Sequence, residues 1–455
     1  MEGESAVQER PGQRLRWRWL AAIVAGGAAL LGALQIPGLF DDDSFRNLAT
    51  ISASLLFAGL LLLWAVFGTG LSRSRKRDAL LLVMITAAAA AGSLRIDGFS
   101  GNLTPRLAWR WLPKPDESLV TDGTRDKTRG GVADLSQATW QDFPQFLGPN
   151  RAAVLAAPTF DTNWPQRPPR LLWRQPIGAG WSSFAVVGDY CVTQEQRGEK
   201  EYVACYELKT GKLVWTHSDP GRFSHSMSGD GPRSTPTIHV GHVYTLGALG
   251  RLNCLDGRSG KRLWSHDIVK ENKAELPHWG KSCSPLLVDG LVIVSAGGTD
   301  GRSLVAYDER SGKQVWHAGD APASYASPRL AELGGVRQIL MVNARSVAGH
   351  ATKDGRLLWE FAWPGEQPKV PDAVAIDDEH VFISAGYGLG CKLLRISDTN
   401  GKQTADVDWQ SNKLKPKFTN VVVRDGFVYG LDDGKALVCL DLAGGKRRWV
   451  GGRYG

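Results

Sequence analysis

The sequence predicts an all-β fold of the β-propeller type, preceded by about three transmembrane α-helices. Two observations carry this prediction: three apolar runs in the first hundred residues, and a tryptophan-ended repeat that returns from residue 173 to residue 449. A length of 455 residues exceeds the size of one hydrophobic core, so at least two structural units are expected. A hydrophobic content of 43% excludes a largely disordered chain, and six cysteines exclude a small disulfide scaffold.

The membrane anchor is predicted over residues 1–96, with helices near 20–40, 48–67 and 79–94. At about 1.5 Å of rise per residue, the first two runs are long enough to cross a hydrocarbon core of roughly 30 Å. The third run is the shortest and is rich in alanine. Instead of a third membrane span, this run could be a buried or interfacial helix. The remainder of the chain would then lie in the cytoplasm.

The charges around these runs predict the topology. Acidic residues 41–43 separate the first two runs, whereas basic residues precede the first run and separate the second from the third; these are Arg10, Arg14, Arg16, Arg18, Arg73, Arg75, Lys76 and Arg77. The positive-inside rule then places the N-terminus in the cytoplasm and everything after the third run outside the cytoplasmic (inner) membrane, in the periplasm of a bacterium. These eight residues match the net charge of +8, so the charge is weak evidence for nucleic-acid binding.

A repeat begins after a polar segment, residues 97–141, that we interpret as a linker. Residues 206–215 recur as 255–264 and 307–316, each with an acidic residue, a Thr/Ser-Gly-Lys or related turn and a final tryptophan. The tryptophans that mark the copies are Trp173, Trp215, Trp264, Trp316, Trp359, Trp409 and Trp449, at a mean interval of 46 residues. A period in this range indicates a solenoid or a propeller.

Short strand signals inside each period favour the propeller. Runs such as 237–240, 291–294 and 427–429 are β-branched or alternating, and turns such as Asp289-Gly290 separate them. Four strands per 46 residues make one propeller blade, whereas helical repeats need a 3.6-residue periodicity that is not found. We expect each marker tryptophan to bury its ring against the neighbouring blade, as a structural docking residue.

This repeat resembles the tryptophan-docking repeat of the PQQ-like (pyrroloquinoline-quinone-type) propellers. That superfamily includes quinoprotein dehydrogenases and the periplasmic propeller lipoprotein of the outer-membrane protein assembly machine. Residues 142–151, 180–184 and 417–420 resemble a bacterial branch with membrane-anchored or secreted members. The resemblance implies an eight-bladed ring when complete. Residues 142–455 hold about six to seven blades, which predicts a C-terminal truncation, with a genuine smaller ring as the alternative.

The resemblance to quinoprotein dehydrogenases implies a calcium ion, a catalytic aspartate and often two adjacent cysteines. No two of the six cysteines are adjacent, and no Cys-x-x-Cys-His haem motif is present. The six cysteines are Cys191, Cys205, Cys254, Cys283, Cys391 and Cys439. Cys205, Cys254 and Cys439 share one position in the repeat, which favours packing in strands, and a cross-strand Cys191–Cys205 disulfide is possible. We therefore expect no cofactor and no metal, and no catalytic residue is identified; PQQ with calcium is the alternative.

The candidate binding residues precede the innermost strands, which face the central funnel of a propeller. They are Trp181, Ser182, Ser183, Arg233, Trp279, Ser282, Tyr325, Lys417 and Asn420. Cationic and aromatic side chains suit a protein partner or a small polar or anionic ligand. The alternative is that they are solvated loop residues or struts between blades. The sequence thus favours an extracytoplasmic binding scaffold, with a PQQ- and calcium-dependent oxidoreductase of alcohols or sugars as the second hypothesis.

Overall fold

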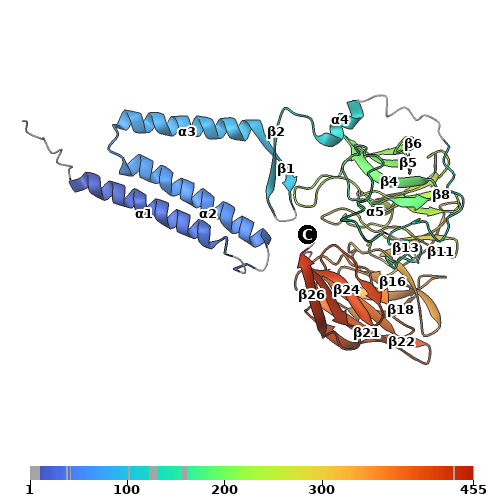
Figure 1. The fold of residues 1–455 in the computed structure, drawn as a ribbon. Coiled ribbons are helices and arrows are strands. Elements are labelled where there is room, and N and C mark those ends of the chain that lie inside the picture. Colours follow the sequence, from blue (N-terminus) through green and yellow to red (C-terminus); the bar gives the residue numbers. More distant parts are fainter. Residues whose placement is uncertain are drawn as a thin grey trace, which may run out of the picture. The chain divides into compact units, whose positions relative to one another are not determined.

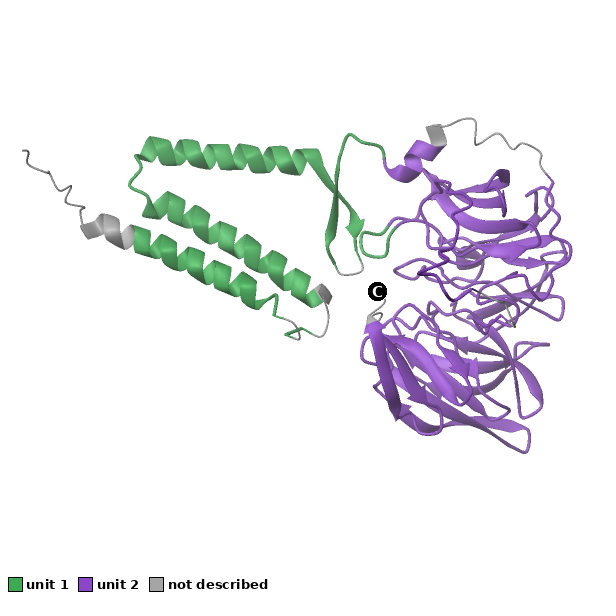
Figure 2. Ribbon diagram, in the orientation of Figure 1, with its two compact units in different colours: residues 1–113, 225–229 green, residues 114–224, 230–455 purple. Residues whose placement is uncertain are grey.

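The computed structural model describes residues 11–36, 39–40, 43–100, 103–121, 132–155, 161–433 and 436–453. The chain divides into two compact units (Figure 2). Residues 1–113 and 225–229 form unit 1, and residues 114–224 and 230–455 form unit 2.

Unit 1 consists of helices and one hairpin (Figure 1). The helices are α1 (Pro11–Ala33), α2 (Asp43–Leu63), its π-helical continuation η1 (Trp64–Gly68) and α3 (Arg73–Ser93). Strands β1 (Leu94–Phe99) and β2 (Pro105–Trp109) pair antiparallel directly after α3. The C-terminal end of α1 lies beside the start of α2, where Gln35 Nε2 donates to Thr50 Oγ1 at 3.1 Å.

The three predicted spans coincide with helices of different bounds, but the described residues support one membrane span and not three. Among the described residues, one helix, residues 45–68, is long and apolar enough to cross a membrane, and residues 17–33 form a shorter apolar helix. The first span was expected to reach residue 40, but α1 ends at Ala33 because the chain turns at residues 34–36, before Pro37. Helix α3 begins earlier than expected, at Arg73, because Ser72 caps it by accepting the Arg75 N–H. Arg10, Pro37, Asp41 and Asp42 lie outside the described residues.

The predicted linker, residues 97–141, contains regular structure. It includes most of the β1–β2 hairpin and helix α4 (Pro115–Thr121), which are regular elements that the interpretation as a linker did not specify. The physical reason is the two-residue alternation of Leu94 and Ile96 with polar neighbours, repeated at Leu107 and Trp109, which favours a two-faced hairpin. Residues 122–131 of this segment lie outside the described part of the chain.

Unit 2 contains six four-stranded antiparallel sheets, here called blades 1 to 6 in chain order. Blade 1 contains β3 (Ala185–Val187), β4 (Tyr190–Arg197), β5 (Lys200–Glu207) and β6 (Leu213–Pro220). Blade 2 contains β7 (Thr237–His239), β8 (His242–Leu246), β9 (Arg251–Asp256) and β10 (Arg262–Asp267), followed by the short helix α5 (Ile268–Glu271). Blade 3 contains β11 (Leu286–Val288), β12 (Leu291–Ser295), β13 (Leu304–Asp308) and β14 (Gln314–Ala318).

The remaining three sheets repeat the same up-and-down order. Blade 4 contains β15 (Arg329–Leu333), β16 (Val336–Val342), β17 (Ser346–Ala351) and β18 (Leu357–Ala362). Blade 5 contains β19 (Val374–Ala375), β20 (His380–Ala385), β21 (Gly390–Thr399) and β22 (Lys402–Ser411). Blade 6 contains β23 (Val422–Arg424), β24 (Phe427–Asp432), β25 (Ala436–Asp441) and β26 (Arg447–Arg453).

Consecutive blades share their hydrophobic cores. Each of five buried clusters joins strands of one blade to strands of the next, from blade 1 through blade 6. The short first strands contact one another from β3 to β7, β11, β15 and β19, so they form the inner edge. This mostly β arrangement is consistent with a propeller. The described residues contain six such sheets, and the blade number of a complete ring stays a prediction.

Five of the seven marker tryptophans contact the next turn in a repeated geometry, whereas Trp359 does not and Trp449 is 43% exposed, contrary to the expectation for these two. Trp215 at the start of β6 donates its Nε1–H to the Gly257 carbonyl of blade 2 at 3.0 Å, and its ring lies over Gly260 of the same turn. A Cβ at Gly260 would approach that ring to 2.5 Å, so this turn needs glycine. Equivalent bonds are made by Trp173, Trp264, Trp316 and Trp409. Trp359 differs, because its indole donates to Gln338 within its own blade at 2.6 Å.

The six cysteines are buried free thiols. Cys191 lies opposite Tyr206 and Cys205 lies opposite Val192 on paired strands β4 and β5. The two thiols therefore occupy adjacent register positions, whose side chains point to opposite faces of the sheet. The cross-strand disulfide considered from the sequence is accordingly not formed.

Candidate functional site

A belt of hydrogen bonds joins the segments that precede the innermost strands. The Thr235 N–H donates to Ser284 Oγ at 2.9 Å, and the Ser284 N–H donates to Ser327 Oγ at 3.0 Å. The Ser327 N–H donates to Asp372 Oδ1 at 2.8 Å, and the Asp372 N–H donates to Asn420 Oδ1 at 2.7 Å. Each bond connects one blade to the next, from blade 2 to blade 6. The belt fixes the spacing of the loops from which the candidate residues project.

Residues 142–151, which we call the strap, run along the same inner edge. Phe143 forms a bridge with Val186 of β3, and the Pro144 carbonyl accepts the Ile238 N–H of β7 at 2.8 Å. At its end, Arg151 donates to the Pro328 carbonyl at 2.9 Å, and also to the carbonyls of Ser284 and Pro285. The strap therefore ties blades 1 to 4 together.

Arg151 is a buried cation, with a relative exposure of 3%. Burial lowers the pKa of Arg151 to about 10, against the favourable charge of Asp372, so the guanidinium stays charged at neutral pH. Burial also raises the pKa of Asp372 to about 6, although Arg329 and Arg151 favour its ionised form. Residues 142–151 were noted in the sequence only as a family-like stretch. Their contacts with four blades could not be inferred from the sequence.

An aromatic cluster brings together predicted site residues from different blades. The rings of Trp279 and Tyr325, before β11 and β15, lie 5.3 Å apart, and the Trp279 N–H donates to Tyr325 Oη at 3.2 Å. Trp279 also lies 6.3 Å from the ring of Phe418, which precedes β23. Phe418 is 6.4 Å from Tyr387 in the β20–β21 turn, and Lys417 Nζ lies 5.4 Å from the Tyr387 ring centre. Blades 3, 4, 5 and 6 thus contribute to one surface.

Two members of this aromatic cluster were missed from the sequence. Phe418 lies within the family-like stretch 417–420 but was not selected as a candidate, and neither was Tyr387. Phe418 is exposed, which is unusual for a large aromatic side chain and could not be inferred from one sequence. Burial raises the pKa of Tyr387 to about 12, so its hydroxyl stays protonated.

Arg233 lies on the blade 2 side of this region. Its Nη1 donates to the Gly231 carbonyl at 2.6 Å and its guanidinium stacks 4.5 Å from the Phe223 ring centre. Burial lowers the pKa of Arg233 to about 10, while the charges of Glu201 and Tyr325 oppose that shift. Glu201 accepts the Ala248 N–H at 3.0 Å, and burial raises its pKa to about 7.

The other candidates have structural contacts. Ser282 Oγ donates to the Tyr325 carbonyl at 2.7 Å, and Asn420 closes the belt, so both act as struts between blades. Ser182 Oγ accepts the Gln194 N–H at 3.2 Å, and the Ser183 carbonyl accepts from Thr193 Oγ1 at 3.1 Å. Trp181 is exposed, and its N–H donates to the Pro232 carbonyl at 2.8 Å. Within the described part of the chain, no hydrogen bond or ring contact joins Trp181, Ser182 or Ser183 to the aromatic cluster.

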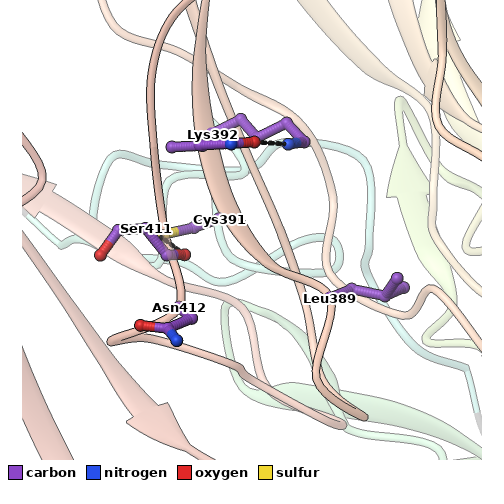
Figure 3. Close-up of a pocket in the computed structure, with 6 residues that line it drawn as sticks. Leu389, Cys391, Lys392, Ser411 and Asn412 are labelled. Carbon is purple, nitrogen blue, oxygen red and sulfur yellow. Dashed lines mark hydrogen bonds between the residues drawn. The ribbon is translucent and has the colours of Figure 1, made fainter.

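A cavity of about 470 Å³ borders the aromatic cluster. Trp279 and Tyr325 line it, together with residues 275–278, 344–345 and 365–369. Lys369 is buried in its wall, where Nζ donates to the carbonyls of Ala344 at 2.6 Å and Gly365 at 3.2 Å. A second hollow of about 400 Å³ lies around Leu389, Cys391 and Asn412 (Figure 3). We place the candidate site at the first cavity, because it shares its wall with the predicted residues.

Comparison with known proteins adds the family. A family model described as outer membrane protein assembly factor BamB, built on PQQ-like repeats, matches residues 166–278 and 199–450. The chain belongs to this PQQ-like repeat family.

The curated relatives of this PQQ-like propeller protein carry enzyme names. It is 26% identical over 231 residues to the dehydrogenase subunit of an alcohol dehydrogenase (quinone) from Gluconobacter oxydans, covering 44% of this chain and 28% of that protein. It is 38% identical over 109 residues to a 1-butanol dehydrogenase (cytochrome c) from Thauera butanivorans, covering 23% of this chain and 14% of that protein. The chain thus spans less than a third of the length of either relative.

Solved structures similar to the propeller include BamB from Moraxella catarrhalis. That match has a TM-score of 0.37 and 15% identity, and covers 58% of this chain and 82% of the other. A europium-containing methanol dehydrogenase matches with a TM-score of 0.39 and 13% identity, covering 59% and 70%.

Within the described part of this PQQ-like propeller, the acidic side chains do not gather into a calcium site of the kind that a quinone cofactor uses. Calcium takes six to eight oxygen ligands, several of them carboxylates. Within the described residues, no group of three or more His, Cys, Asp or Glu side chains is placed to hold a metal ion. Asp372, the buried carboxylate at the inner strand starts, is subject to the positive charges of Arg151 and Arg329, which would repel calcium. We therefore derive no catalytic step through such a group.

Proposed function

We propose that this protein is a membrane-anchored, extracytoplasmic PQQ-like propeller that acts as a binding scaffold. The observation that carries the proposal is the aromatic cluster of Trp279, Tyr325, Tyr387 and Phe418, which four blades present together with Lys417 beside the cavity. Residues from four blades suit a ligand that extends across several loops. A single blade could not form this surface.

The chemistry of the aromatic cluster favours an extended segment that carries carboxylate groups and an aromatic or proline side chain. Lys417 and Arg233 offer cationic donors, and charge-assisted hydrogen bonds to carboxylates are stronger than neutral ones. The exposed Phe418 ring offers a stacking surface, and aromatic pairs contribute about 0.5–1.5 kcal/mol beyond the area that they bury. A protein segment of this composition is the occupant that we propose, with a small anionic ligand as the second candidate.

The proposed topology places the N-terminus in the cytoplasm and the propeller in the periplasm, after three helices. The apolar helix at residues 45–68 and the basic residues between α2 and α3 support it. A reporter enzyme that is active only in the periplasm, fused after Gly148, is expected to be active. An inactive fusion, with an active one after residue 42, would contradict this topology.

Site-specific photocrosslinking tests the binding surface. A photoreactive phenylalanine analogue at position 418 is expected to give a discrete adduct in cells, because this side chain is exposed at the centre of the cluster. The same analogue at Val240, which is exposed in the β7–β8 turn, is the control and should not give that adduct. Lys417→Glu should weaken the adduct at 418. An adduct that is the same at both positions, or no adduct at all, would contradict a binding role for the cluster.

The alternative function is a PQQ- and calcium-dependent oxidoreductase, and it is favoured by the names of the curated relatives. Such a cofactor, when bound, would supply two-electron oxidation of an alcohol or sugar. The test adds PQQ and calcium to the purified full chain, with a dye acceptor and a panel of alcohols and sugars. We expect no dye reduction. Turnover that a chelator abolishes would overturn the scaffold proposal.

A further inference from the structure

The β1–β2 hairpin has one apolar face and one polar face. The register pairs Leu94 with Trp109 and Ile96 with Leu107, so these four side chains share one face. Arg95 pairs with Ala108, and Gly98 with Arg106, on the other face. Trp111 continues the apolar face beyond β2, because its ring stacks on Trp109 at 4.9 Å and 17°.

This apolar face is exposed in the described structure. The relative exposures are 55% for Ile96, 61% for Leu107, 48% for Trp109 and 64% for Trp111. A lone two-stranded hairpin is marginally stable in water, so a contiguous exposed apolar face indicates that something covers it. The polar face has a neighbour already: a Cβ at Gly98 would lie 3.5 Å from the Ser226 carbonyl oxygen.

The hairpin continues directly from the third helix. β1 begins at Leu94, the C-cap residue of α3, and the Arg110 N–H donates to the Ser93 carbonyl at 2.8 Å. The hairpin also reaches the start of α2, where Asn47 Nδ2 donates to Thr104 Oγ1 at 3.3 Å. In Figure 1 it lies across the ends of α2 and α3. In the proposed topology both of these helix ends lie at the outer surface of the membrane.

We propose that the apolar face of the hairpin lies in the interfacial layer of the phospholipid bilayer, with the opposite face directed to water. The inference rests on the proposed membrane anchor. Tryptophan side chains concentrate at membrane–water interfaces, because the ring is apolar and the indole N–H needs a polar partner. Arg106 lies on the opposite face of the hairpin, where its charged side chain is exposed. A bilayer surface therefore matches both the position and the composition of the hairpin.

Fluorescent labelling of the full chain tests this placement. The six native cysteines are buried, so an exposed cysteine introduced by Leu107→Cys or Ile96→Cys can be labelled selectively with an environment-sensitive dye. Arg106→Cys, on the opposite face and one residue away, is the matched control. Each labelled chain is reconstituted into phosphatidylcholine–phosphatidylglycerol vesicles that contain a lipid with a nitroxide near its headgroup.

We expect a loss of dye emission at positions 96 and 107 and little loss at 106, with a weaker effect when the nitroxide lies deep in the acyl chain. Two labelled positions on one face keep the test valid if one variant folds poorly. If the chain floats with vesicles after a carbonate wash but neither position is quenched, the inference is wrong and the anchor stands. Blue-shifted emission without quenching by lipid would show that protein covers the face, which also overturns the inference. If the chain does not float, the anchor fails, and the interfacial placement fails with it.

Discussion

Replacing Arg151 by alanine should loosen the centre of the propeller. The guanidinium donates to Gln145 Oε1 at 3.0 Å within the strap and to backbone carbonyls before β11 and β15. Hydrogen bonds from charged groups contribute about 1.5–3 kcal/mol each, and an acceptor left buried without a donor costs about 1–3 kcal/mol. Water entering the vacated space restores part of this loss, so we expect a cost of about 3–5 kcal/mol, as for other broken buried charge contacts.

The assay is thermal unfolding of the full chain in detergent, followed by tryptophan fluorescence. Since about 1 kcal/mol lowers Tm by roughly 2–4 °C for a domain of this kind, Arg151→Ala should lower the apparent Tm by roughly 6–20 °C. Arg170→Ala is the control, because Arg170 is an exposed arginine of the same unit and should change little. If both variants melted at the wild-type temperature, the strap would not hold the blades together, and this account of residues 142–151 would be refuted.

Three further predictions concern single residues. Trp215→Ala should destabilise the propeller by about 3–5 kcal/mol, because Trp215 is only 1% exposed. Trp449→Ala should cost about 1 kcal/mol, because the Trp449 side chain is 43% exposed. Paired thermal melts in detergent measure both effects. Asn420→Ala should cost about 1–3 kcal/mol in the same melts, because the Asp372 N–H loses its acceptor, and an unchanged melt would contradict the belt. Stability should fall as pH rises from about 4 to 7, because burial raises the pKa of Glu201 to about 7 in the folded chain from about 4.3 when unfolded. The folded state binds the proton of Glu201 more tightly, so the stability gained from this proton is present below about pH 4 and is lost as the pH rises through about 7. Glu201→Gln should flatten the dependence of stability on pH. An equal slope in both proteins would refute the role of Glu201.

The repeat domain could be predicted from the sequence because its defining interaction repeats. Each blade interface needs one large ring, one glycine beneath it and one carbonyl acceptor, and these recur at a nearly constant interval, as at Trp215, Gly257 and Gly260. Trp359, which bonds within its own blade, is an exception for a related reason: the turn of the next repeat does not lie beneath its ring. The next turn, at Gly401, belongs to long strands β21 and β22, and nothing lies within 4 Å of a Cβ at that glycine. Local patterns therefore predict the repeat, but not where the chain departs from it.

The hairpin was missed for the opposite reason. A pair of five- and six-residue strands gives few alternating positions, and the nearby prolines and charges are typical of a linker. Its identity as a hairpin depends on the pairing of β1 with β2, which a single strand pattern does not show. The exposed apolar face became visible only when Ile96 and Leu107 were placed opposite each other.

The candidate site was partly predictable because propeller topology places every segment before an inner strand on the same end. That argument selected Trp279, Tyr325 and Lys417, which the structure brings together. It could not separate them from Ser282 and Asn420, since struts and ligand-facing residues share the same positions in the repeat. Only the contacts between blades distinguish the two roles.

This division of roles has a consequence for how the site can bind. The belt residues are joined to backbone groups of the next blade, so they hold the loops at fixed spacing. The neighbouring aromatic and cationic side chains are more exposed and can be replaced without breaking the belt. A binding surface mounted in this way is preorganised, and a ligand that spans several blades does not have to pay the entropic cost of ordering them. Substitutions at Phe418 or Lys417 should therefore change binding while leaving the unfolding temperature nearly unchanged, whereas substitutions at Asn420 should do the reverse.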